Sequence, residues 1–153
     1  MSKSIKILAA ALLVSVGIGA VATASMNGDA EIYNVDNRNI AVGGYDVVSY
    51  LKEDKAVAGS ARFAAEHGGV TFHFASAENR DIFQREPQKY VPEFGGFCAF
   101  GIRMGKKLPI DPSAYTVVDN KTYVFLDRAT ITMWKDDVNG NIRFARKLWP
   151  EIR

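Results

Sequence analysis

Cysteine is almost missing from this chain, because Cys98 is the only one among 153 residues. A single cysteine cannot form an internal disulfide, and it excludes Cys-x-x-Cys and haem-attachment motifs. Histidine is nearly as scarce, with only His67 and His73. The sequence also lacks a glycine-rich nucleotide loop between a strand and a helix, and a serine-centred nucleophile elbow. No recognisable catalytic constellation is left, which favours a role other than catalysis.

Long hydrophobic runs are also scarce, and the one that is present lies near the N-terminus. It covers residues 7–22, follows two lysines, and precedes the small residues Ala22-Thr23-Ala24. This is the pattern of a secretory signal peptide, and its 16 residues fall short of the roughly 20 that span a bilayer. The sequence therefore predicts a signal peptide at 1–24 and a periplasmic or secreted protein without a stable membrane anchor after cleavage. The alternative is an uncleaved anchor.

Net charge disappears once this segment is removed. The whole chain has 19 Lys and Arg against 17 Asp and Glu. Lys3 and Lys6 lie in 1–24, which holds no acidic residue, so the mature chain has 17 residues of each sign. Without a net positive charge, there is no field to attract nucleic acid or anionic lipid. We therefore expect a metal ion or a small ligand as the partner, and no nucleic acid.

The remaining residues suit one domain with a single core. Residues 25–39 are polar and irregular and are expected to form a linker, with the folded domain at 40–153. The sequence shows no internal repeat. Strand-like and helix-like patterns are grouped rather than alternating, which predicts an α+β fold. We expect a small antiparallel sheet made of hairpins, a short central helix and a C-terminal helical segment.

Two hairpins are predicted where turn residues separate strand-like runs. The first joins 62–67 to 70–74 across Gly68-Gly69, and the second joins 115–118 to 122–126 across 119–121. In the second strand of the first hairpin, alternation places two sets of side chains on opposite faces. One set is Val70, Phe72 and Phe74, and the other is Thr71 and His73.

Helices are predicted from caps and periodicity. Ser76 is a suitable N-cap for a helix over 77–85. Apolar residues at three- and four-residue steps between 131 and 148 predict an amphipathic C-terminal helix. We expect Asp127 to cap this helix and Asn139-Gly140 to break it in two.

Two further segments have less regular patterns. The run 45–51 after Gly43-Gly44 is rich in valine and tyrosine, which favours a short strand. Residues 90–101 contain too many glycines and prolines for a simple element. They are expected to form an ordered loop that leads into a short strand or turn holding Cys98.

Four residues are candidate metal ligands: Cys98, His73, His67 and Met104. A thiolate together with a thioether or an imidazole suits Cu(I), which needs only two or three soft ligands. The two histidines could share a metal if they pair across the first hairpin. Cys98 could instead be a thiol that reacts with an oxidant, or an inert buried residue, since free cysteine is among the most buried residue types.

Several motifs resemble the YHS domain, whose pattern is an aromatic strand, a helix with a phenylalanine and then Pro-x-x-Tyr. This pattern matches the run from Val70 to Phe83 followed by Pro87-Gln88-Lys89-Tyr90. Three more segments resemble one branch of that family, the exported YHS domain-containing (seleno)proteins. They are Gly43–Tyr50, Phe94–Ala99 and Ile110-Asp111-Pro112, and the whole resemblance covers roughly Ile40 to Pro150.

The resemblance implies metal or thiol chemistry. YHS domains occur in heavy-metal transport ATPases and are associated with metal binding through a cysteine pair just after the aromatic strand. Here Ala75 and Asn79 stand where those cysteines are expected, so the usual site is expected to be lost. The (seleno)protein branch then directs attention to its one thiol position, Cys98.

The favoured function is therefore an exported YHS-type protein that binds a soft or transition metal, with copper preferred, through Cys98. No other cofactor is expected. One alternative is a non-catalytic periplasmic binding or interaction module, for which an apolar pocket beside Tyr45, Tyr50 and Phe97 would be the signature. The other alternative is a single-cysteine thiol redox protein.

Overall fold

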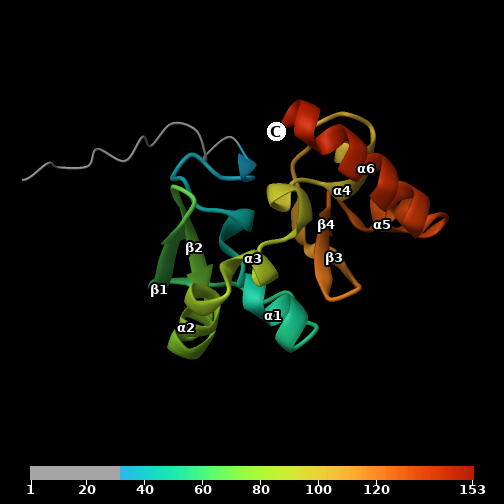
Figure 1. The fold of residues 1–153 in the computed structure, drawn as a ribbon. Coiled ribbons are helices and arrows are strands. Elements are labelled where there is room, and N and C mark those ends of the chain that lie inside the picture. The colour runs from blue at the N-terminus through green and yellow to red at the C-terminus, as the bar shows by residue number, and fades with distance from the viewer. Residues whose placement is uncertain (1–31) are drawn as a thin grey trace, which may run out of the picture.

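The structure, a computed structural model, describes residues 32–153 (Figure 1). The predicted signal peptide and residues 25–31 of the predicted linker lie outside this range. The predicted α+β class is confirmed, and the strands form two separate antiparallel hairpins. The elements in chain order are η2 (Val42–Gly44), α1 (Val47–Lys52), β1 (Ser60–His67), β2 (Val70–Phe74), α2 (Ala77–Arg85), α3 (Pro87–Tyr90), η3 (Glu93–Gly96), α4 (Ala99–Arg103), β3 (Asp111–Val118), β4 (Lys121–Phe125), α5 (Arg128–Lys135) and α6 (Val138–Ile152).

Both predicted hairpins are confirmed, and both close through a two-residue turn. The second turn is shorter than the predicted 119–121, because Lys121 already pairs with Val118 and begins β4. Gly68 and Gly69 have φ values of 57° and 76°, and Asp119 and Asn120 have 49° and 58°. Positive φ at both central positions is the requirement of a type I′ turn, whose twist matches that of the flanking strands. Glycine meets this requirement in one hairpin and the Asp-Asn pair meets it in the other.

The two hairpins are built alike, residue for residue. In each, an eight-residue strand pairs with a five-residue strand, and the register shifts after the first pair. That shift separates Ser60↔Phe74 from Ala64↔His73 in one hairpin, and Asp111↔Phe125 from Tyr115↔Val124 in the other. Every pair in the second hairpin lies 51 positions after its counterpart in the first.

The segments before the hairpins are also alike. Three successive residues with positive φ precede α1 (Val42-Gly43-Gly44) and α4 (Phe94-Gly95-Gly96). The residue at the N-cap of each helix then donates its backbone N–H to a residue just before the hairpin. Asp46 donates to the Val57 carbonyl at 2.8 Å, and Cys98 donates to the Leu108 carbonyl at 3.3 Å. The chain therefore contains a structural repeat, which the sequence did not reveal, of a first unit (42–85) and a second unit (94–135).

Both units end in a helix that is capped as predicted. The Ser76 hydroxyl accepts from the Asn79 N–H at the start of α2, and the Asp127 carboxylate accepts from the Thr130 N–H at the start of α5. The break in the C-terminal helical segment lies before Val138 and not at Asn139-Gly140. Its cause is Asp137, whose carboxylate accepts from the Gly140 N–H at 2.9 Å and so starts α6 there.

Two predicted elements are corrected by the structure. The run expected to be a strand at 45–51 contains helix α1, because the Asp46 carboxylate accepts from the N–H groups of Val48 and Ser49 and caps a helix. A good cap here outweighs the strand preference of valine and tyrosine. Cys98 lies at the N-cap of helix α4, and not in a short strand or turn.

Each unit has its own hydrophobic core, and the two cores meet along the second hairpin. Val124 of β4 belongs to the first core, whereas its neighbours Tyr123 and Phe125 belong to the second. Residues 32–39, which were predicted to be linker, pack at this junction. Asn34 donates its side-chain amide to the Gly96 carbonyl at 3.0 Å, and Tyr33 is buried in the first core.

Tyr50 provides another link between the units. Its burial leads us to expect a loss of stability at alkaline pH. It is completely buried, and its hydroxyl donates to the Pro112 carbonyl at 2.7 Å. Burial raises the pKa of Tyr50, and burial with a hydrogen bond to Asp54 raises the pKa of Tyr115 to about 12. The folded protein therefore keeps protons that the unfolded chain releases near pH 10.

This stabilisation is complete below pH 10 and is lost as the pH rises towards 12. Urea unfolding at pH 9, 10.5 and 11.5 should show a decreasing free energy of unfolding. The decrease in the free energy of unfolding per pH unit should be smaller in Tyr50→Phe, because phenylalanine has no hydroxyl proton to release. Equal slopes in the two proteins would contradict the assignment of this effect to Tyr50.

Candidate functional site

Cys98 is completely buried. It lies in the core of the second unit, with Ala99, Ile102 and Trp134 among the residues of that core. A thiol without access to solvent can neither react with an oxidant nor meet an ion unless the core opens. The geometry is therefore that of a small hydrophobic residue.

The two histidines lie on opposite faces of the first hairpin. His67 is paired with Val70, whereas His73 is paired with Ala64. Directly paired residues point to the same face, so His67 shares the buried face of Val70, and His73 lies on the other face. His67 also contacts aromatic rings edge-on, with 5.9 Å between its centroid and that of Phe83. The pairing across the turn that a shared metal requires is not formed.

Met104 lies at the C-cap of α4, and 46% of it is exposed. The four candidate ligands are thus spread over a hairpin of the first unit, a core of the second unit and the end of a helix. Within residues 32–153, no group of three or more His, Cys, Asp and Glu side chains is placed to hold a metal ion.

Asp46 contacts both positions, 75 and 79, at which the resemblance to YHS domains places metal-binding cysteines. Its carboxylate is completely buried and accepts four hydrogen bonds. The donors are the N–H groups of Val48 (2.9 Å), Ser49 (3.3 Å) and Ala75 (2.9 Å), and the side-chain amide of Asn79 (2.8 Å). Ala75 and Asn79 are the two positions where the resemblance places cysteines. In this chain they hold a buried carboxylate, so the site is a structural clamp between α1 and the β2–α2 connection.

The second unit has a different residue at the same point. Cys98 is the counterpart of Asp46, since both occupy the N-cap after the three positive-φ residues. No carboxylate clamp is formed there, and an apolar core surrounds the thiol. The location of Cys98 is thus explained by the repeat, without any ligand.

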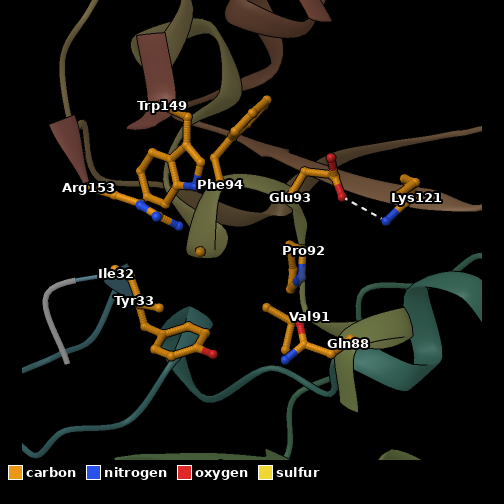
Figure 2. A pocket seen from close by; sticks show the side chains of 11 residues that line it. Ile32, Tyr33, Gln88, Val91, Pro92, Glu93, Phe94, Lys121, Trp149 and Arg153 are labelled. Carbon is orange, nitrogen blue, oxygen red and sulfur yellow. Dashed lines mark ion pairs between the residues drawn. The ribbon is translucent and has the colours of Figure 1, made fainter. Parts of the chain in front are cut away.

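A pocket of about 290 Å³ lies at the junction of the two units (Figure 2). We call it the junction pocket. On the side of the first unit the pocket is lined by Tyr33 and Gln88. On the side of the second unit it is lined by Lys121 and Trp149, and the segment 91–95 connects the two sides. Arg153 lies beside Trp149 at the pocket, as Figure 2 shows.

Glu93 is the fixed polar group of this pocket. Its side chain is only 19% exposed and forms ion pairs with Lys121 at 3.0 Å and with Arg146 at 3.4 Å. Arg153, in contrast, has no ion pair within the described part of the chain. The charged side chains that line the pocket or pair with Glu93 are therefore three cations, Lys121, Arg146 and Arg153, against one carboxylate. Trp149 supplies an aromatic surface, held by the ring of Phe94 at 6.0 Å between centroids.

Backbone strain at this pocket has a structural origin. Phe94 has a φ of 60°, which is unusual for a bulky residue, and such strain can mark a functional site. However, its counterpart Val42 in the first unit has a φ of 53°. Because both units share this conformation, it belongs to the repeated turn and not to the pocket.

Of the three aromatic residues expected beside an apolar pocket, Tyr45 and Tyr50 both lie beside Pro112, whereas Phe97 lies elsewhere, against the second core. Tyr50 is buried against Pro112. Tyr45 lines a separate hollow of about 310 Å³ with Pro109. Phe97 packs beside Trp149, with 6.2 Å between ring centroids. The residues of the junction pocket were not identified from the sequence, because neither Glu93 nor Trp149 belongs to a recognisable motif.

No family model matches the sequence, and no match was found among curated proteins or solved structures. The resemblance to YHS domains therefore stays a prediction. Within residues 32–153, none of the helices has the length and apolar character needed to cross a bilayer.

Proposed function

We propose that this chain is an exported, non-catalytic binding module that holds a small ligand in the junction pocket. Export is supported by the signal-peptide pattern at 1–24. Binding is supported by the pocket itself, which combines aromatic surface with a few ordered polar groups at a junction between two units. Junctions of this kind are preferred places for ligand sites.

The charges around the pocket favour a ligand with an anionic group. The Glu93 carboxylate is already matched by Lys121 and Arg146, so it orients its neighbours and is not free to attract a cation. The Arg153 guanidinium remains available at the pocket, and arginine is well suited to hold a carboxylate or a phosphate. Trp149 and Tyr33 would contact the apolar or flat part of the same ligand.

Trp149 provides a direct test, because its fluorescence should change when the pocket is filled. We would titrate the protein with a panel of small aromatic carboxylates and organic phosphates. Arg153→Gln should weaken binding by about tenfold or more, which is the usual effect of losing a charge-assisted hydrogen bond. Arg143→Gln is the matched control, since Arg143 lies in α6, the helix that ends just before Arg153, is exposed and does not line the pocket.

Trp149→Phe should remove the fluorescence change while calorimetry still detects binding. The second tryptophan, Trp134, is completely buried and should contribute a constant signal. If no compound in the panel binds, or if Arg153→Gln and Arg143→Gln bind equally well, the junction pocket is not the binding site.

The copper hypothesis is supported by the sequence resemblance but by no contact among residues 32–153. It would need the second core to open at Cys98, since that side chain is completely buried. It would also need a second ligand, and both histidines lie on the hairpin of the other unit. For these reasons we prefer the binding module.

A further inference from the structure

A hollow of about 340 Å³ lies among α4, α5 and α6; α4 and α5 pack beside the second hairpin, and α6 packs on these two helices (Figure 1). We define the helix patch as the five residues of this hollow that matter here, namely Phe100, Arg103, Met133, Asp136 and Phe144. None of them belongs to the junction pocket.

The helix patch contains the two most exposed large hydrophobic side chains of the described chain. Phe144 is 56% exposed and Met133 is 47% exposed. The repeated unit does not require this exposure, because Ile82, the counterpart of Met133, is partly buried against the first core. Large apolar side chains that are exposed side by side are typical of a surface that another molecule covers.

The patch also contains a cation without a polar partner. The Arg103 guanidinium lies over the ring of Phe100 at 5.3 Å and over the ring of Phe144 at 5.8 Å. Its Nε atom is buried and has no hydrogen-bond partner. Among the ion pairs of residues 32–153, none involves Arg103.

An acidic residue in the same hollow is equally unmatched. Asp136 is exposed and forms no ion pair within the described residues. Asp136 and Arg103 both line the hollow, yet they do not meet within one molecule. Asp137 also lines the hollow, where its carboxylate accepts from the Gly140 N–H and caps α6. A surface that presents an arginine and a carboxylate without ion pairs around an apolar centre is complementary to a copy of itself.

We propose that the helix patch is the interface of a homodimer with two-fold symmetry. In such an interface, each contact between two different residues occurs twice. Arg103 of one protomer would pair with the partner's Asp136, and the reverse pair would form on the other side of the axis. Phe144 and Met133 would pack at the centre. Phenylalanine, methionine and arginine are enriched in the cores of protein interfaces.

The first test is the mass of the purified, exported chain by sedimentation equilibrium from about 1 to 500 μM, the range of a modest interface. We expect a reversible monomer–dimer equilibrium. Phe144→Asp should weaken the dimer by tenfold or more, as loss of a central interface residue does. Val117→Asp should have no effect, because Val117 is a similarly exposed apolar residue (39%) outside the patch.

The second test is an exchange of charges. Arg103→Glu and Asp136→Arg should each weaken the dimer, and the double variant should recover most of the lost affinity because the pair is reformed with reversed signs. Asp136 is exposed, so its substitution leaves folding intact even if Arg103→Glu does not, and circular dichroism checks both. A monomer at all concentrations, a dimer that is insensitive to Phe144→Asp, or a dimer that is insensitive to Asp136→Arg would overturn the proposal.

Discussion

Replacing Asp46 with alanine is expected to lower the free energy of unfolding by about 3–5 kcal/mol, because several buried donors lose their acceptor at once. The carboxylate is completely buried and accepts four hydrogen bonds. Its removal leaves the N–H groups of Val48 and Ala75 and the Asn79 amide without an acceptor, and each unsatisfied buried group costs about 1–3 kcal/mol. The Ser49 N–H keeps the backbone carbonyl of residue 46 as its acceptor at 3.2 Å.

Urea unfolding followed by circular dichroism measures this loss, and Asp127→Ala is the matched control. Asp127 also caps a helix, the one that follows the hairpin of the second unit, but it lies at the surface. Its removal should cost about 1 kcal/mol. If Asp46→Ala is no more destabilising than Asp127→Ala, the buried clamp does not hold the first unit together.

Alkylation of Cys98 is expected to be at least about a thousand times slower in the folded protein than in the urea-unfolded chain. The thiol is completely buried, so a reagent reaches it only when the second core opens. Opening a core costs a large part of the total stability, and a domain is stable by about 5–15 kcal/mol. Mass spectrometry after timed exposure to iodoacetamide gives both rates.

A Cu(I) titration, together with the alkylation rates, tests the metal and redox hypotheses for Cys98. Cu(I) titration of Cys98→Ala should give the same affinity as the unmodified protein, because alanine fills the site without introducing a polar group. Rapid alkylation of the folded chain, or a loss of Cu(I) affinity in Cys98→Ala, would contradict the buried thiol. Either result would favour the metal or redox interpretation over the binding module.

The parts of the fold that were predicted correctly depend on neighbouring residues. Gly68-Gly69 defines a hairpin, and Ser76 and Asp127 each cap a helix that begins at the next residue. Helix α1 was missed because the strand preference of valine and tyrosine was given more weight than the local cap that Asp46 forms with the N–H groups of Val48 and Ser49. The burial of Asp46 in a larger network was hidden for another reason. Two of its four hydrogen bonds come from Ala75 and Asn79, and no local pattern shows this.

The repeat was missed because the two units share backbone conformations but few side chains, among them Phe74 and Phe125. A type I′ turn can be made by Gly-Gly or by Asp-Asn, and a helix cap can be a serine or an aspartate. The junction pocket was missed for another reason. Glu93, Lys121 and Trp149 come from separate segments that meet only in the folded chain.

Each unit spans only some forty residues, a length at which a single core rarely encloses enough apolar surface to fold alone. Val124 fills the core of the first unit from the hairpin of the second, and Tyr50 of the first unit is anchored to Pro112 of the second. A single unit on its own would therefore be expected to fold only in contact with another molecule that covers the same surface. Joining two copies in one polypeptide makes that association permanent and independent of protein concentration.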